Sequence, residues 1–227
     1  MDQNQMYDLQ TVEVMKRVLQ ESSNCIDVGC HSGVFLDEIL RFSPKGFHYG
    51  FEALPSLSTQ LIKKYKTNPK VAIHGLALSD ETGEVTFEHV VSNPGYSGLK
   101  QRRYDRPNEI IEQIKVKTAK LDDIIPPSVD IAFIKIDVEG AELQVLRGAK
   151  ETLRRNRPVL IFEHGLGAAD CYGTTPADVY DLLCSDLGFG IHLMERWLEN
   201  SAGQPLSREE FHDEFASGRN FYFMAIT

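Results

Sequence analysis

The sequence predicts an α/β fold in which a doubly wound, mostly parallel sheet carries helices on both faces. Two observations predict it. From residue 25 onward, short apolar runs alternate with longer segments of helical periodicity, which is the order expected when crossover helices join parallel strands. The run 131–136 is apolar almost throughout, as in a strand that is buried on both faces. With 227 residues, of which 42% are hydrophobic, the chain is long enough for one domain, 1–227, with one sizeable core.

The predicted elements follow in order along the chain. Apolar residues at helical spacing within residues 1–20 predict an amphipathic helix that covers part of the sheet. Strands and helices then alternate at 25–28, 34–41, 47–51, 56–66 and 71–78. Alternating polarity at 84–91 and 114–118 predicts an inserted antiparallel β-hairpin. A strand at 131–136, a helix at 141–154, a strand at 159–162, a helix at 176–187 and strands at 189–194 and 221–226 complete the pattern.

Composition excludes several classes of protein. A net charge of -9 would repel a phosphate backbone, so nucleic acid is not an expected partner. The sequence has neither the apolar block of a signal peptide nor an apolar run long enough for a membrane span. The four cysteines lack metal-ligand spacing and are too few for a disulfide framework. We therefore expect free thiols and a cytoplasmic protein that does not bind membranes.

A glycine-containing turn follows the first strand, in the order Asp27-Val-Gly29-Cys-His31-Ser-Gly33. Its two glycines let the backbone turn sharply and let a ligand approach the main chain. The dinucleotide fingerprint would have glycine where His31 stands, and Asp27 would repel a pyrophosphate. S-adenosylmethionine suits the turn better, because it carries an ammonium and a sulfonium and no phosphate. A purely structural turn is the alternative.

Two further segments end at the same predicted edge of the sheet. Glu52 closes the second strand about 20 residues after Gly29, where an acidic residue of this architecture binds ribose hydroxyls. Ser79 and Asp80 close the third strand and could frame an adenine ring, with a plain turn as the alternative. Open parallel sheets bind ligands at the carboxyl ends of their strands, so these residues and Asp27 predict one cofactor site.

The segment 133–142 reads Phe-Ile-Lys-Ile-Asp-Val-Glu-Gly-Ala-Glu. It resembles the I-K-I-D-V-E-G-x-E signature of FkbM-type methyltransferases, which modify hydroxyls of sugars and polyketides. Similar motifs stand in the family's order over about residues 25–162, although the chain has Cys-His-Ser at 30–32 and Glu-Ala at 52–53, where the family usually differs. The resemblance implies a Rossmann-like domain with a seven-stranded sheet and an antiparallel last strand. It also implies O-methylation by S-adenosylmethionine, with S-adenosylhomocysteine as product.

Three residues are candidates for catalysis. Methylation of a hydroxyl needs a group that takes its proton, and Asp137 follows the fourth strand of the predicted parallel series, beside the cofactor crevice. Glu163 and His164 end the next strand, and His164 is a second candidate base because imidazole titrates near neutral pH. A divalent metal shared by these three residues is possible, but no ligand spacing demands it, so no metal is predicted.

The loops 92–108 and 165–175 are predicted to flank the site and to bind the acceptor. The first contains Lys100, Arg102, Arg103 and Arg106, which would suit an anionic acceptor or simply form a solvated surface. Two other functions stay open. The chain could be a non-catalytic binding module on this fold, or a nicotinamide-dependent oxidoreductase. The sequence also leaves the oligomeric state open, with a homodimer as one alternative.

Overall fold

A computed structural model of the chain describes residues 2–104 and 108–227. Its main feature is a seven-stranded sheet with the strand order β3-β2-β1-β7-β8-β10-β9. These strands are β1 (Cys25–Val28), β2 (His48–Phe51), β3 (Val71–His74), β7 (Phe133–Ile136), β8 (Val159–Glu163), β9 (Gly190–His192) and β10 (Tyr222–Ile226). The order reverses at β1, which pairs with β2 on one side and β7 on the other.

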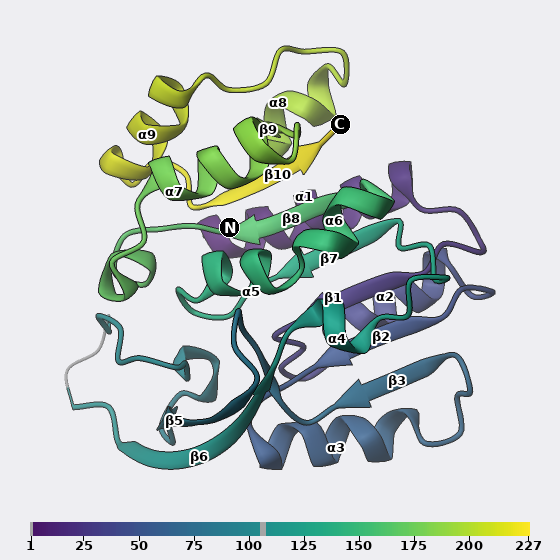
Figure 1. Cartoon of the computed structure of the whole chain (residues 1–227), viewed down its shortest axis with the longest axis vertical. Helices are drawn as coiled ribbons and strands as arrows, with labels where there is room; N and C mark the ends of the chain where they lie inside the picture. Colours follow the sequence, from purple (N-terminus) through teal and green to yellow (C-terminus); the bar gives the residue numbers. More distant parts are fainter. Residues whose placement is uncertain (1, 105–107) are drawn as a thin grey trace.

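The sheet is parallel except at β10. β1, β2, β3, β7 and β8 pair in parallel, whereas β10 is antiparallel to both of its neighbours, β8 and β9. In Figure 1 the arrows of β3, β7 and β8 point to the left of the view and β10 points the opposite way. The predicted fold class is therefore confirmed, including the antiparallel last strand.

Helices cover both faces of this sheet (Figure 1). One face packs against α1 (Gln3–Val18), α2 (Val34–Phe42), α3 (Pro55–Tyr65) and α8 (Met194–Glu199). The other packs against α4 (Leu121–Ile124), α5 (Glu142–Gly148), α6 (Lys150–Asn156), α7 (Pro176–Tyr180) and α9 (Arg208–Ser217). Because side chains alternate along a strand, Ile26 packs toward α5 while Cys25 packs toward α1 and α2. We call these two sides the α1 face and the α5 face.

The inserted hairpin belongs to a second, three-stranded sheet with the order β4-β6-β5. β5 (Gly83–Val90) and β6 (Ile111–Ala119) are antiparallel, as predicted. The predicted strand 71–78 is wrong in one respect, because it divides into β3 and β4 (Ala77–Leu78). β4 leaves the main sheet and pairs with β6, so the chain crosses between the two sheets beside the carboxyl end of β3.

The helical predictions also need correction. The helix expected at 141–154 is two helices, because Asp122 accepts hydrogen bonds from the amides of Glu151 and Thr152 and caps a new helix, α6. The helix at 176–187 continues from α7 as a π-helical turn, Asp181–Asp186. α8 and α9 were not predicted. Ser207 and Glu210 form a capping box at the start of α9, a signal that the sequence does contain.

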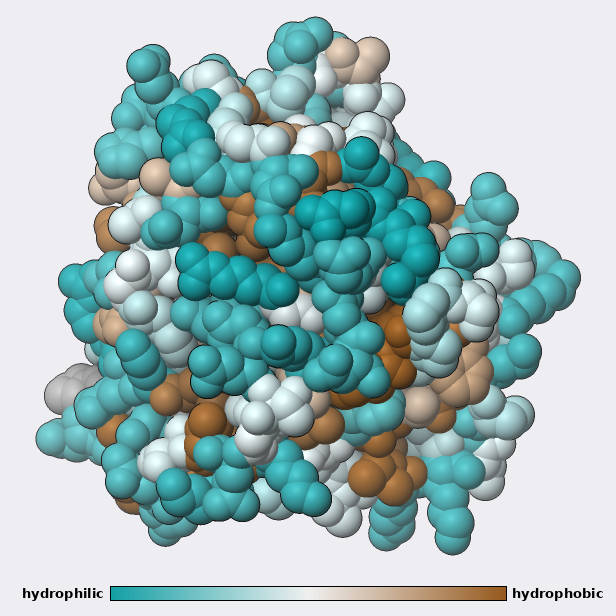
Figure 2. Space-filling view, in the orientation of Figure 1, coloured by the Kyte–Doolittle hydropathy of each residue, from teal (hydrophilic) through white to brown (hydrophobic). Residues whose placement is uncertain are grey.

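Polar side chains cover most of the face of the molecule shown in Figure 2, and hydrophobic ones appear there in small separate areas. The apolar residues lie mainly in the cores on either side of the main sheet. Among the described residues, no helix combines the length and the hydropathy needed to cross a bilayer.

Candidate active site

A cavity of about 330 Å³ lies at the carboxyl ends of β1, β2 and β7. Its walls come from residues within 28–35, 51–54, 76–78, 94–99 and 135–141, with Asp8 of α1 and Phe87 of β5 in addition. This is the point where the strand order reverses, which is where open α/β sheets bind ligands. Four of the predicted cofactor residues line it: Gly29, His31, Glu52 and Asp137.

The turn after β1 lies very close to the backbone that follows β7. Gly29 has a φ of 80°, and a Cβ atom at this position would lie 1.8 Å from the carbonyl oxygen of Asp137. The ends of β1 and β7 can therefore meet only if residue 29 is glycine. His31 also adopts the left-handed conformation, with a φ of 48°, a region in which histidine is enriched among non-glycine residues.

Glu52 is fixed by this turn. Its Oε2 accepts a hydrogen bond of 2.8 Å from the amide of His31, and its Oε1 accepts one of 2.8 Å from the amide of Leu54. Burial raises the pKa of the Glu52 carboxyl, while these backbone hydrogen bonds act in the opposite direction. Each oxygen keeps a further lone pair, so a carboxylate at this wall can still accept hydrogen bonds from a ligand.

Four predicted cofactor residues stand apart from the lining: Asp27, Gly33, Ser79 and Asp80. Gly33 begins α2 with a φ of 77°, and a Cβ there would lie 2.8 Å from both Leu61 Cδ2 and Tyr65 Oη, so its role is in packing α2 against α3. Ser79 and Asp80 are also outside the cavity wall, which is formed instead by residues 76–78. At this end of the third strand, the structure agrees with the plain turn that was the alternative.

Asp27 is 1% exposed, and neither of its carboxylate oxygens has a hydrogen-bond partner among the described residues. It does not line the cavity, but Lys135, its partner in the β1–β7 register, does. Burial raises the pKa of Asp27 to about 6, although the nearby positive charge of Lys135 opposes this shift. The structure thus places a buried carboxyl group, with the Cys30 thiol close to it, beside the cavity.

A row of polar side chains crosses the α1 face at the carboxyl ends of the strands. Asp27 of β1 pairs in register with Lys135 of β7, and Glu163 of β8 pairs with Tyr222 of β10. Asp137, two residues after Lys135, shares its direction along the strand. Strand alternation therefore brings side chains from four strands to one face, although their positions in the sequence are far apart.

Asp137 is the centre of this row. Its Oδ2 accepts hydrogen bonds from Lys135 Nζ at 2.8 Å and from Tyr222 Oη at 2.5 Å. Burial raises the pKa of Asp137, but the charge and hydrogen bond of Lys135 and the bond from Tyr222 outweigh it, so the pKa lies below its ordinary value. Lys135 Nζ also lies 4.6 Å from the centre of the Phe35 ring, which lines the cavity. Asp137 is therefore an ionised, oriented carboxylate.

Glu163 lies next to Asp137 on the same face. Ligand oxygens of Asp137, Glu139 and Glu163 all lie within 4.8 Å of one another. Glu163 is 8% exposed, and its Oε2 has no hydrogen-bond partner in the described part of the chain. Burial and the neighbouring charges of Asp137 and Glu142 raise the pKa of Glu163 well above its ordinary value.

The turn 138–140 aims Glu139 toward this group. Glu142 accepts hydrogen bonds of 3.1 Å from the amides of Val138 and Gly140, and Glu139 adopts a left-handed φ of 59°. Its carboxylate forms an ion pair with Arg102 from the loop 92–108, in a contact that leaves both side chains about 15% exposed. Glu142 therefore shapes the turn rather than facing the cavity, as expected for an acidic residue in a first helical turn.

The structure does not bring His164 to the cavity. It follows Glu163, so its ring points to the α5 face, where it is fully buried. The ring stacks on Phe211 and Phe215 of α9, with centroid distances of 5.7 and 4.7 Å. Burial lowers the pKa of His164 to about 4. The predicted juxtaposition of His164 with Asp137 fails for this geometric reason, and a metal shared with His164 fails with it.

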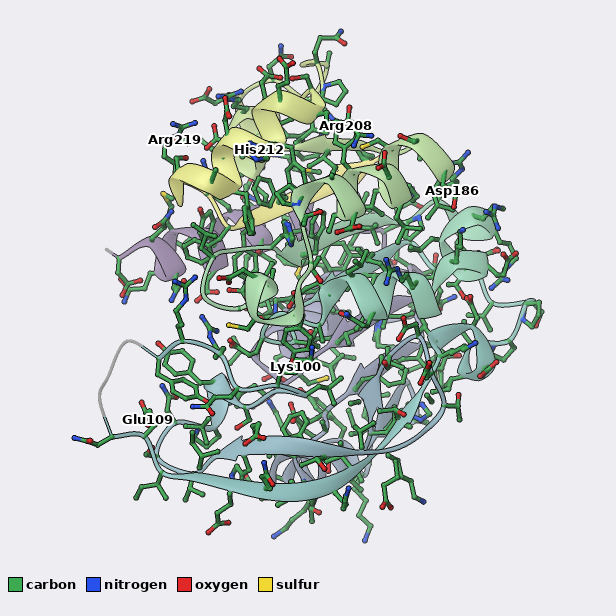
Figure 3. The ribbon with its side chains drawn as sticks, turned by 60° about the vertical axis from the view of Figure 1, so that its left-hand side comes forward. Lys100, Glu109, Asp186, Arg208, His212 and Arg219 are labelled. Carbon is green, nitrogen blue, oxygen red and sulfur yellow. The ribbon has the colours of Figure 1, made fainter. Side chains whose placement is uncertain are left out.

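The two predicted acceptor loops contact each other. The amide of Arg103 donates to the carbonyl of Gly167 at 2.8 Å, and its guanidinium pairs with Asp170. The amide of Lys100 donates to Tyr172 Oη at 2.8 Å. Figure 3 shows Lys100 between the small sheet and the segment 165–175. Residues within 94–99 line the cavity, so the first loop closes one of its sides.

The described cations of the first loop, Lys100, Arg102 and Arg103, have partners within the chain. Arg102 pairs with Glu139, Arg103 pairs with Asp170, and Lys100 Nζ lies 5.3 Å from the centre of the Tyr172 ring. Arg106 lies outside the described residues. These contacts stabilise the closed loop, so they give no added support to the anionic acceptor, which stays a prediction.

Sequence reasoning missed some residues of this site. Lys135 lines the cavity, a position that the sequence pattern alone did not indicate. Tyr222 and Asp8 were not singled out at all. The residues at 135, 137 and 163 could have been assigned to one face from strand alternation, whereas Asp8 depends on how α1 crosses the sheet.

The fold and the cavity at its switch point define a class, the Rossmann-like methyltransferases. The Methyltransferase FkbM domain matches residues 27–191, and the chain belongs to this family. It is 27% identical to 2-O-methyltransferase NoeI of Sinorhizobium fredii (strain NBRC 101917 / NGR234) over 151 residues, which are 58% of this chain and 59% of that protein. The alignment thus spans less than two thirds of that relative.

Two solved structures share the fold. Methyltransferase FkbM from Methylobacillus flagellatus KT matches with a TM-score of 0.54 and 16% identity, over 92% of this chain and 44% of that one. SMU.1697c, a putative methyltransferase from Streptococcus mutans in complex with SAH, matches with a TM-score of 0.50 and 11% identity, over 97% of this chain and 96% of that one. At these identities the likeness concerns the fold.

Proposed function

We propose that this methyltransferase transfers a methyl group from S-adenosylmethionine to the hydroxyl of a small molecule such as a sugar, glycan or polyketide-like natural product. The observation that carries the proposal is the single cavity that holds Glu52 at one wall and Asp137 at another, beside the turn at Gly29. The 2-O-methyltransferase name of the Sinorhizobium relative and the SAH bound to the Streptococcus protein support it.

The residues of the cavity suit this cofactor. A volume of about 330 Å³ lies within the range of small-molecule sites. Glu52 would accept hydrogen bonds from the ribose hydroxyls, and the apolar side chains of Leu54, Leu78 and Phe87 would contact the adenine. The carboxyl groups around the cavity favour a cationic ligand over a pyrophosphate. When bound, S-adenosylmethionine supplies an electrophilic methyl group on a sulfonium and leaves as S-adenosylhomocysteine.

Asp137 is the proposed proton acceptor. Its Oδ2 is held by Lys135 and Tyr222, so the carboxylate has a fixed orientation and Oδ1 is left for the acceptor hydroxyl. The hydroxyl proton would pass to Asp137 as the acceptor oxygen forms its bond to the methyl carbon. Glu163 would bind a neighbouring hydroxyl of the acceptor, and the loops 92–108 and 165–175 would enclose it.

Binding calorimetry tests the cofactor. We expect S-adenosylmethionine and S-adenosylhomocysteine to bind, and NAD not to bind. Glu52→Gln should weaken binding of S-adenosylmethionine by roughly 10-fold or more, because a charge-assisted hydrogen bond is worth about 1.5–3 kcal/mol. Glu84→Gln on β5 is the matched control, since Glu84 is exposed and is not among the residues that line the cavity.

The same titrations decide between the alternatives. Binding of NAD alone would support the oxidoreductase, and binding of none of the three ligands would support the non-catalytic module. A panel of sugar and polyketide acceptors, assayed for transfer of labelled methyl, then identifies the acceptor class.

A further inference from the structure

We infer that Asp137, Glu139 and Glu163 form a binding site for one hard divalent cation, such as Mg²⁺ or Mn²⁺, at the acceptor side of the cavity. The cation site is a property of the chain by itself. Its use to hold the acceptor hydroxyl rests on the proposed function.

Geometry is the first support. One ligand oxygen from each of these three residues lies within 4.8 Å of the other two, a spacing that one ion can bridge. Asp137 directly follows β7, and Glu163 ends the adjacent strand β8. Glu139 lies in the turn 138–140, which Glu142 holds through the amides of Val138 and Gly140. The site is therefore built on fixed elements rather than on flexible surface side chains.

The second, independent support is an unpartnered atom. Glu163 is about nine-tenths buried, its side chain contributes an oxygen to this group, and its Oε2 receives no hydrogen bond from the described residues. A buried carboxylate oxygen without a donor is costly, and buried polar groups in folded proteins normally have a partner. A cation at the centre of the three carboxylates supplies that partner.

Charge is the third support. Three carboxyl groups meet here, and two more, Asp27 and Glu142, lie near enough to act on them electrostatically. The cations among the described residues that act on this group are Lys135 and Arg102. Carboxyl groups therefore outnumber cations here, and a bound divalent ion would reduce their mutual repulsion. Mg²⁺ and Mn²⁺ fit because carboxylate and water oxygens are their preferred ligands.

Arg102 is the internal competitor for this ion. Its guanidinium pairs with Glu139, while Asp137 Oδ2 accepts hydrogen bonds from Lys135 and Tyr222, and no hydrogen bond from the described residues reaches Oδ1. A cation would therefore take an oxygen of Glu163 and a Glu139 oxygen released from Arg102, and it would share Asp137 Oδ1 with the acceptor hydroxyl, since each carboxylate oxygen has two lone pairs. A hydroxyl of the acceptor bound to the same ion would be more acidic, would pass its proton to Asp137, and would be held beside the methyl donor.

The test is a titration of Mn²⁺ into the EDTA-treated full chain, without cofactor or acceptor, with free Mn²⁺ followed by electron paramagnetic resonance. We expect one ion per chain. Glu163→Gln should weaken the affinity by roughly 10-fold or more, as changes within a metal site do. Glu112→Gln, at an exposed position on β6, should leave it unchanged. Arg102→Ala should bind Mn²⁺ more tightly than the wild type, which a merely structural role of the carboxylates does not predict.

Two results would overturn the inference: no saturable Mn²⁺ binding by either the wild type or Arg102→Ala, or equal affinities of the wild type and Glu163→Gln. Circular dichroism and binding of S-adenosylhomocysteine in EDTA show that each variant is folded. If S-adenosylmethionine binds and Mn²⁺ does not, this inference fails and the proposed function stands. If Mn²⁺ binds and S-adenosylmethionine does not, the reverse holds.

Discussion

Buried polar side chains have different surroundings on the two faces of the main sheet, although the same strands carry them. On the α1 face, Lys135, Asp137 and Tyr222 form a connected group of hydrogen bonds beside the cavity. On the α5 face, His164 is packed among phenylalanine rings with neither ring nitrogen hydrogen-bonded in the described part of the chain. One face keeps charged groups for a ligand, and the other holds its histidine in the neutral form.

This difference shows that adjacency in the sequence is a poor guide to adjacency in a site when the residues lie on a strand. Glu163 and His164 are neighbours in the chain, but the pleat turns one toward Asp137 and the other toward α9. Lys135 and Glu163 are far apart in the chain and share a face. The comparison can be tested by changing one residue on each face.

The largest effect is expected from Asp137→Asn. The amide keeps the size of the side chain but removes the proposed proton acceptor, so kcat should fall by about 10²–10⁴-fold, the usual contribution of general base catalysis. The affinity for S-adenosylmethionine should change far less, because Glu52 and the turn at Gly29 are untouched. Single-turnover methyl transfer and calorimetry separate the two quantities.

Glu112→Gln is the control for this experiment, since Glu112 is exposed and is not among the residues that line the cavity. An Asp137→Asn variant that is folded, binds the cofactor and keeps the wild-type kcat would show that the polar group on the α1 face does not serve catalysis.

His164→Leu should leave kcat within about twofold of the wild-type value, because the side chain lies on the face away from the cavity. The substitution should instead change how the free energy of unfolding depends on pH. Burial lowers the pKa of His164 to about 4, below its ordinary 6.5. Stability due to the neutral ring is thus complete above pH 6.5 and is lost as the pH falls toward 4. At about 1.4 kcal/mol per pKa unit, the wild type loses roughly 3 kcal/mol over this window through His164. The variant should lack this loss, which a comparison of the free energies of unfolding in urea at pH 7 and pH 4 measures.

A His164→Leu protein with a strongly reduced kcat, but with unchanged unfolding at both pH values, would contradict the division between the faces. Leucine has a volume similar to that of histidine, so little strain is expected from the change itself.

Asp27→Asn should have the opposite pH signature. Burial raises the pKa of Asp27 to about 6 from 3.8, so the folded protein favours the protonated carboxyl. The associated stability is present below pH 4 and is lost as the pH rises through 6. The asparagine variant avoids this loss and should be more stable than the wild type at pH 7 by roughly 3 kcal/mol, with little difference at pH 4.

Asp130→Asn is the matched control because Asp130 is exposed. The same Asp27→Asn protein should bind S-adenosylmethionine more weakly if the carboxyl is retained for the cofactor, as destabilised binding sites often are. Equal stability of Asp27→Asn and wild type at pH 7 would mean that Asp27 has a partner in solution that its buried position does not reveal.

The sequence predicted where the main strands occur along the chain because each is short, apolar and bounded by turn residues. Local patterns could not show that β4 leaves the main sheet, since the pairing of Ala77 and Leu78 depends on β6, which comes later in the chain. They also could not show the break between α5 and α6, which depends on a cap from Asp122.

For the candidate site, motifs predicted Gly29, Glu52 and Asp137 correctly as residues at one edge, because each directly follows a parallel strand. The same reasoning failed for His164, since it used the end of the strand and left out the face. Ser79 was assigned to the cofactor on position alone, although the chain had already turned toward the second sheet there. Placement on a face needs strand alternation as well as strand ends.

The smallest expected effect is the coupling between the two faces. Asp27 and His164 point to opposite sides of the sheet and share no partner among the described residues, so the stability changes of Asp27→Asn and His164→Leu should add to within about 0.5 kcal/mol in the double variant. In the wild type, the two residues change the free energy of unfolding with pH in opposite directions, so their contributions largely cancel between pH 4 and 6. The double variant should lack both contributions. Urea unfolding of the four proteins at pH 4, 5, 6 and 7 measures this. A coupling of more than about 1 kcal/mol would show that the charge state of one face is transmitted through the sheet to the other.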